Sequence, residues 1–102
     1  MNHIMTIGTF PPHKTNALFE IYMSKDKPAY PDFIKKLHNW STPSVKGKYR
    51  RITVYECPEE KLYQGMLALS KRYNFYGQIE GYTFEILPLI SEADSIKIAQ
   101  AK

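Results

Sequence analysis

Residues 48–57 read KYRRITVYEC and alternate with a period of two, which is typical of a β-strand. β-Branched and aromatic side chains fill this stretch, and Pro58 ends it. Ile52 and Val54 share one face, which we expect helices to cover. The strand is therefore predicted to lie at the centre of a sheet that has one apolar and one unusually polar face. The polar face carries two phenols, a guanidinium and a hydroxyl, from Tyr49, Arg51, Thr53 and Tyr55.

The composition is that of a globular chain. At 102 residues it is predicted to form one domain, residues 1–102, with a core over about residues 3–90. A hydrophobic content of 43% with 24% charged residues argues against disorder. No apolar run approaches the roughly 20 residues that a membrane span needs, and the first residues lack a signal-peptide pattern. For the same reason no membrane partner is expected. Cys57 is the single cysteine, so we expect no internal disulfide and a cytoplasmic location.

Positive charge is concentrated in one interval. The net charge is +4, and no acidic residue lies between Asp32 and Glu56. Two interpretations of this predicted basic hairpin stay open: lysines that discourage edge-to-edge pairing of strands, or a surface for anions or nucleic acid. The basic residues of the interval are Lys35, Lys36, Lys46, Lys48, Arg50 and Arg51.

The other segments predict three further strands and two main helices. Strands are expected at about residues 3–10, 34–41 and 82–90, and helices at about 15–25 and 58–73, with a short tail helix over 91–102. Segment 30–42 also fits a short helix, because Phe33, Leu37 and Trp40 follow helical spacing. We favour a strand there, because the strand at 48–57 needs an antiparallel neighbour. The resulting order, β-α-β-β-α-β, indicates an α+β fold of the split βαβ kind.

Three stretches of the chain carry a resemblance to a known group: KKLHNW at 35–40, KYRRITVYECPEE at 48–60 and GYTFEILPLI at 81–90. Over about residues 3–90 the chain resembles the ferredoxin-like domains of the dimeric α/β-barrel superfamily, and it is most similar to short members of unknown function. The resemblance implies a homodimer through the sheet faces, with two helices on the other face. It also implies a pocket between each sheet and its own helices or the partner.

The same resemblance implies several kinds of activity. Members of the superfamily include monooxygenases that act on aromatic substrates without a cofactor, isomerases, haem-degrading enzymes and proteins without known chemistry. No residue pattern in this chain matches a catalytic motif, so the catalytic residues are unknown and no cofactor is expected.

The polar face of the strand at 48–57 is the candidate site. If Ile52 and Val54 face the helices, the polar face turns outward, and matching parity brings Glu85 beside Arg51. One interpretation is a polar and aromatic dimer interface. The other is a pocket for a small aromatic or carboxylated molecule, with Arg51 as the anion contact and tyrosines as walls. The candidate ligand-binding residues are Tyr49, Arg51, Thr53, Tyr55, Glu85, His38 and Trp40.

Histidine and cysteine give little indication of chemistry. His3, His13 and His38 have no metal-ligand spacing, so no metal site is predicted. His38 falls on the same predicted strand face as Trp40, where it could serve as a general base or a haem ligand. Cys57 ends a strand just before a helix, whose dipole could lower its pKa, although a packing role is the simpler interpretation.

An RNA-binding module is a further alternative, because RNA-recognition domains share this element order and a basic, aromatic sheet. Their third strand follows a defined pattern, of which Lys46 and Gly47 match the first two positions. Lys48 then replaces the stacking aromatic residue, which disfavours a nucleic-acid partner. Three function classes follow: a dimeric ligand-binding protein, a cofactor-independent monooxygenase or isomerase, and an RNA-binding module.

Overall fold

The structure is a computed structural model that describes residues 2–101, without the side chains of residues 44 and 45. It confirms the α+β class. The sheet has four strands in the order β2-β3-β1-β4, and every neighbouring pair is antiparallel. The strands are β1 (Asn2–Phe10), β2 (Lys35–Val45), β3 (Lys48–Cys57) and β4 (Thr83–Leu89). The helices are α1 (Thr15–Tyr22), α2 (Leu62–Phe75) and α3 (Glu92–Gln100), with single 3-10 turns η1 (Pro12–Lys14), η2 (Glu59–Lys61) and η3 (Tyr76–Gln78).

Two predictions about the strands are confirmed. β3 has the predicted bounds and lies between β2 and β1, inside the sheet. Segment 30–42 contributes β2, so the alternative of a short helix there is wrong. The turn between β2 and β3 explains the pairing, because Lys46 and Gly47 both have positive φ, 51° and 78°. Two-residue turns of this kind match the right-handed twist of the strands that they join.

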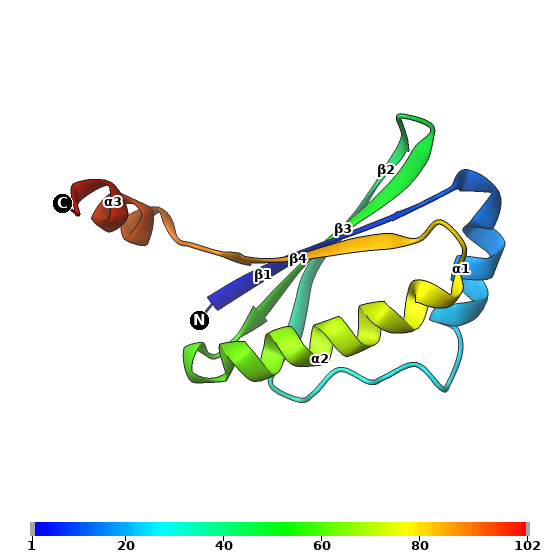
Figure 1. The fold of residues 1–102 in the computed structure, drawn as a ribbon. Coiled ribbons are helices and arrows are strands. Elements are labelled where there is room, and N and C mark those ends of the chain that lie inside the picture. Colours follow the sequence, from blue (N-terminus) through cyan, green and yellow to red (C-terminus); the bar gives the residue numbers. More distant parts are fainter. Residues whose placement is uncertain (1, 102) are drawn as a thin grey trace.

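The helices α1 and α2 lie on one side of the sheet (Figure 1). Two clusters of side chains form the core between these helices and the sheet. The cluster beneath α2 consists of Ile4, Ile34, Tyr55, Cys57, Leu69 and Tyr73. The cluster beside α1 consists of Phe10, Leu18, Tyr76 and Ile79. α3 extends away from the rest of the chain, and all of its residues are exposed. Its start is as predicted, because the Ser91 hydroxyl accepts a hydrogen bond from the backbone N–H of Asp94.

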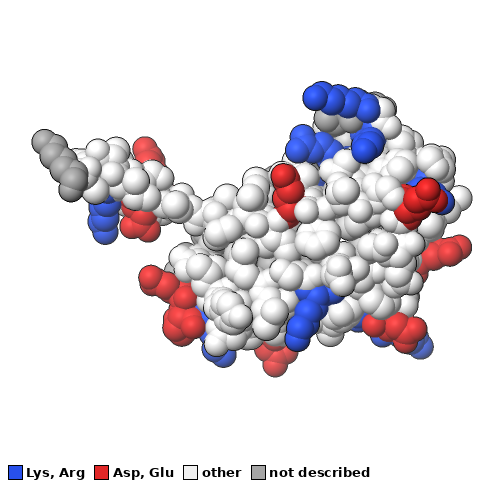
Figure 2. Space-filling view, viewed as in Figure 1, with Lys and Arg blue, Asp and Glu red and all other residues white. Residues whose placement is uncertain are grey.

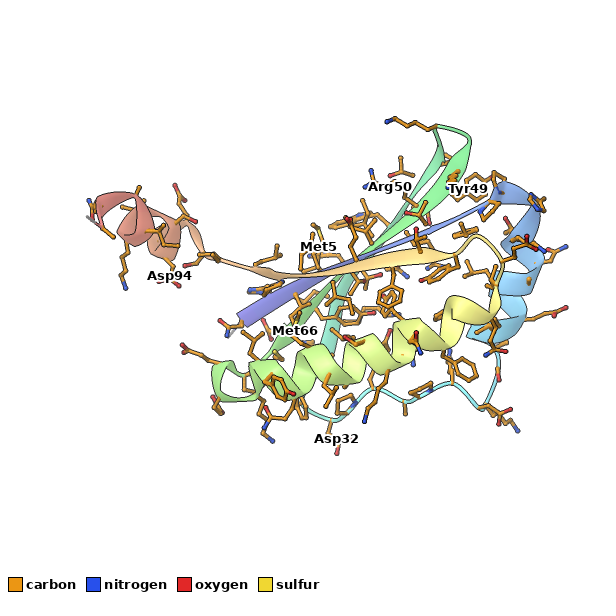
Figure 3. All side chains as sticks on the ribbon, viewed as in Figure 1. Met5, Asp32, Tyr49, Arg50, Met66 and Asp94 are labelled. Atoms are coloured by element: carbon orange, nitrogen blue, oxygen red, sulfur yellow. The ribbon has the colours of Figure 1, made fainter. Side chains whose placement is uncertain are left out.

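The prediction of which sheet face the helices cover is wrong. Tyr55 packs beneath α2 in the core, whereas Ile52 and Val54 face the uncovered side. Figure 3 shows Met5 on that uncovered side, while Met66 points from α2 toward the sheet. The reason is that a tyrosine ring buries more apolar area than a β-branched side chain, provided that its hydroxyl finds a partner.

Those partners form a chain of four hydroxyl groups inside the core. The Thr6 and Tyr73 hydroxyls are 2.7 Å apart, as are those of Tyr73 and Tyr55, and the Tyr55 and Tyr30 hydroxyls are 2.8 Å apart. No buried side-chain nitrogen or oxygen of the described residues lacks a hydrogen-bond partner. The hydroxyl chain therefore joins β1, α2, β3 and the segment before β2, and each of its oxygens has a hydrogen-bond partner.

We predict that Tyr55→Phe lowers the free energy of unfolding by about 1–3 kcal/mol, because it leaves two buried hydroxyls without a shared partner. The measurement is urea unfolding followed by circular dichroism. Tyr63→Phe is the matched control, since the Tyr63 side chain on α2 is 76% exposed. Equal stability of the two variants would show that the hydroxyl chain does not stabilise the fold.

Candidate functional site

A cavity of about 320 Å³ lies between the sheet and the helices α1 and α2. This volume is in the range of sites for small organic molecules. Its floor is β3, which contributes the four residues singled out from the alternation, Tyr49, Arg51, Thr53 and Tyr55. The four share a face as predicted, but this face turns toward the chain's own helices and not outward.

The other three candidate residues lie on the opposite face of the sheet. Glu85 is paired with Ile7, whereas Gly8 is the partner of Arg51, so the predicted meeting of Arg51 and Glu85 is wrong. His38 and Trp40 pair with Val54 and Ile52 on the same uncovered face. Their rings stack there with centroids 4.9 Å apart.

A β-bulge in β2 brings Lys36 into the cavity. Lys36 pairs with Tyr55, and His38 pairs with Val54. The two β2 residues are two positions apart, whereas their β3 partners are adjacent, so one residue of β2 has no partner in β3. A bulge shifts the alternation by one residue. Lys36 consequently lines the cavity, while His38 and Trp40 turn to the other side. A strand without this bulge would place Lys36, His38 and Trp40 on one face.

Aromatic rings form the walls of the cavity. Tyr76 and Tyr82 stack with centroids 5.5 Å apart, and Tyr22 and Tyr30 line it from α1 and the following segment. Gly8 leaves room for Tyr82, because a Cβ atom at Gly8 would lie 2.5 Å from the Tyr82 hydroxyl oxygen. These walls were not identified from the sequence, since their residues are far apart along the chain.

Burial makes four phenols of the site harder to ionise. It raises the pKa of four tyrosines above the ordinary value, Tyr30, Tyr55, Tyr76 and Tyr82. A phenol with a raised pKa can donate and accept hydrogen bonds near neutral pH, but it does not act as a base there.

Three cationic side chains line the cavity, Lys36, Arg51 and Arg72. Arg72 is only 6% exposed, donates a hydrogen bond of 2.7 Å to the carbonyl oxygen of Pro28, and places its guanidinium 3.8 Å from the centroid of the Tyr30 ring. Among the described residues, no aspartate or glutamate lines the cavity. The site is therefore positively charged and aromatic.

Arg72 could have been recognised in the sequence as a residue of the inner face of α2. It lies three residues after Leu69 and next to Tyr73, and residues three apart on a helix are neighbours on its surface. The cation reaches the cavity because the carbonyl of Pro28, 44 residues away in the chain, accepts its hydrogen bond.

The basic interval of the sequence divides in space. Figure 2 shows Lys and Arg side chains over the tip of the β2–β3 hairpin, where Lys46 and Lys48 are exposed. Lys36 and Arg51 line the cavity instead. Arg50 lies on the uncovered face, and Figure 3 shows it on the side of the sheet away from α2. The interval thus supplies both an exposed basic tip and part of the cavity.

Cys57 is a packing residue. Its side chain is fully buried beneath α2, and burial raises the pKa of the thiol, so the possibility of a lowered pKa is wrong. Within residues 2–101, no group of three or more His, Cys, Asp or Glu side chains could hold a metal ion. In the same part of the chain, no helix is both long and apolar enough to cross a membrane.

Comparisons with known proteins add little to this geometry. No protein-family model matches the chain. No curated protein matches it either. Among solved structures it is similar to the de novo designed protein Foldit4, with a TM-score of 0.49 and 9% sequence identity over 90% of this chain and 100% of that one.

We predict that at least four of the eight tyrosines ionise above the ordinary pH of about 10 in the folded protein. Above that pH the unfolded chain releases phenolic protons that the folded chain keeps, so stability falls as the pH rises. The measurement is the absorbance of phenolate during an alkaline titration, with the protein in guanidinium chloride as control. Ionisation of all eight tyrosines near pH 10 without loss of the circular dichroism signal would contradict the prediction.

Proposed function

We propose that this protein binds a small aromatic organic anion, such as a carboxylate, in the cavity between its sheet and its helices. The observation that carries the proposal is a cavity lined by aromatic rings and three cations, with no acidic residue among the described residues of its lining. Arg51 is the expected anion contact, because a guanidinium pairs with a carboxylate through two parallel hydrogen bonds. The rings of Tyr22, Tyr76 and Tyr82 would pack against the aromatic body of the ligand.

The residues of the cavity favour binding over acid–base catalysis. Histidine and carboxylate side chains, the most frequent bases for proton abstraction near neutral pH, do not occur in the described lining. The four phenols whose pKa is raised by burial do not act as bases there. A cofactor-independent monooxygenase or isomerase therefore has less support than a binding protein. The RNA-binding alternative also has less support, because Tyr49 packs toward the helices and is not presented on the uncovered face.

We predict that benzoate binds in the cavity and that Arg51→Met weakens this binding at least tenfold, about 1.4 kcal/mol, by removing the anion contact. Binding can be followed by the chemical shifts of backbone amides. Arg50→Met is the matched control, since the neighbouring arginine lies on the other face of the sheet.

Benzamide has the shape of benzoate without its charge, so it should bind more weakly to the wild-type protein. Equal binding of benzoate and benzamide, or unchanged binding by Arg51→Met, would contradict an anion site at Arg51.

We further propose a homodimer through the uncovered sheet face, as in the dimeric α/β-barrel superfamily. The order of the elements and the strand order β2-β3-β1-β4 support a ferredoxin-like arrangement of this kind. The uncovered face carries apolar side chains, among them Trp40, which is 54% exposed, and Leu87 and Leu89 of β4, beside polar ones such as His38 and Glu85. α3 exposes two further apolar side chains, Ile96 and Ile98. Large exposed apolar patches mark interaction sites, and a second copy offers the same surface in return.

A cytoplasmic location belongs to the same proposal. It is supported by Cys57, a buried free thiol, because proteins of reducing compartments keep their cysteines unpaired.

We predict a mass in solution of about twice 11.9 kDa, measured by sedimentation equilibrium. Trp40→Asp should shift the equilibrium to the monomer, because it places a charge in the apolar face. Tyr63→Asp, on the exposed side of α2, should not. A wild-type monomer at high protein concentration would rule out the dimer.

A further inference from the structure

Three cationic side chains that line the cavity and a fourth beside them, Lys27, surround the rings of Tyr22 and Tyr30. The Lys27 amine, the Lys36 amine and the Arg51 guanidinium lie 4.1, 5.9 and 6.0 Å from the centroid of the Tyr22 ring. Lys36 also approaches the Tyr30 ring, which Arg72 covers, so it lies at the centre of the group. The Lys27 amine donates a hydrogen bond to the backbone carbonyl of Tyr22, a residue of the cavity wall. The cationic cluster thus consists of Lys27, Lys36, Arg51 and Arg72.

No carboxylate of the described residues neutralises this cluster. Within residues 2–101, the ion pairs are His3 with Glu56 and Lys97 with Asp94, and neither lies at the cavity. Arg72 is buried, whereas Lys27, Lys36 and Arg51 are partly exposed. A charge taken out of water is normally paired, because an unpaired one is costly.

The cations of the cluster contact aromatic rings. The Lys27 amine is 4.1 Å from the centroid of the Tyr22 ring, and the Lys36 amine is 5.5 Å from that of Tyr30. A ring quadrupole attracts a cation only weakly compared with a full negative charge. The cluster is therefore electrostatically incomplete without a bound anion.

We infer that the anion taken by this cavity is a compact dianion, the phosphate group of a small aromatic phosphate monoester. This inference rests on the proposed function and names the head group of its ligand. A monocarboxylate would neutralise one of four positive charges, whereas a phosphate monoester carries close to two negative charges at neutral pH. Its three terminal oxygens can accept hydrogen bonds from several directions, which suits cations that converge from β2, β3 and α2.

Binding of a dianion should also be coupled to protons. Burial and the neighbouring arginine and lysine charges lower the pKa of Lys27 and Lys36 in the free protein. A bound dianion would raise both, so the complex holds more protons and the affinity falls as the pH rises through the lowered values. The titratable and charged groups facing Lys36 are Tyr22 of α1, Lys27, Tyr30, Arg51 and Tyr55 of β3, and Arg72 of α2.

The test compares four probes by calorimetry at low salt: phenyl phosphate, methyl phenyl phosphate, benzoate and isophthalate. Phenyl phosphate is expected to bind at least tenfold more tightly than the other three, because methyl phenyl phosphate and benzoate carry one charge and isophthalate holds its two charges apart. Proton uptake, measured in buffers of different ionisation enthalpy at alkaline pH, should accompany phenyl phosphate.

Lys36→Met should remove most of the preference for phenyl phosphate over benzoate, whereas Lys35→Met, at an exposed neighbouring position, should not. Lys36→Met should also raise the melting temperature of the free protein, because it removes a charge that its neighbours disfavour. A variant damaged in its fold would instead melt at a lower temperature, and Lys36→Gln would then replace it in the binding test.

The outcomes separate the two proposals. Binding of benzoate as tight as that of phenyl phosphate, or tighter binding of isophthalate, would overturn the dianion inference and leave the proposed function standing. Failure of all four probes to bind would overturn both.

Discussion

The fold depends on the chain of hydroxyl groups that runs from Thr6 through Tyr73 and Tyr55 to Tyr30. Each phenol buries a large apolar ring, which stabilises the core only if its oxygen is hydrogen-bonded. Four hydroxyls carry four protons but share three hydrogen bonds, so one proton is not used within the chain. If the hydroxyls donate in order from Thr6 to Tyr30, this proton belongs to Tyr30. Because Tyr30 lines the cavity, the outer end of this network can offer a donor to whatever the cavity holds. The interaction that lets β3 turn its tyrosines inward thus also shapes the candidate site.

The local structure could be predicted well because it depends on near neighbours. The alternation at 48–57 predicted the bounds of β3, and the pattern at about 58–73 predicted a helix where α2 lies. Which face is covered depends instead on the balance between ring area and hydroxyl partners, and those partners come from other elements. Alternation separates the two faces of a strand but does not say which one packs, and tyrosine suits either surroundings.

The candidate site shows the same limit. The alternation brought together four residues that do line one cavity, because they belong to a single regular strand. Regular alternation does not place Lys36 and His38 correctly, because a bulge between them moves His38 to the other face of the sheet. No pattern in the sequence indicates this bulge. Arg72 was missed because its place depends on a hydrogen bond to Pro28 in a distant segment. Regular elements could be predicted, whereas irregularities and long-range contacts could not.

β3 and β2 place several residues against the usual preference for apolar side chains inside and polar ones outside. The face that the helices cover carries Arg51, Lys36 and a set of phenols beside its apolar core, whereas the uncovered face carries Ile52, Val54 and Trp40 beside polar residues. Cations without a carboxylate favour a bound anion, and exposed apolar side chains favour another surface to pack on. The proposed ligand and the proposed partner copy would therefore both follow from the orientation of β3. They remain separable by experiment, because Arg50 and Arg51 are adjacent in the chain and lie on opposite faces of the same strand.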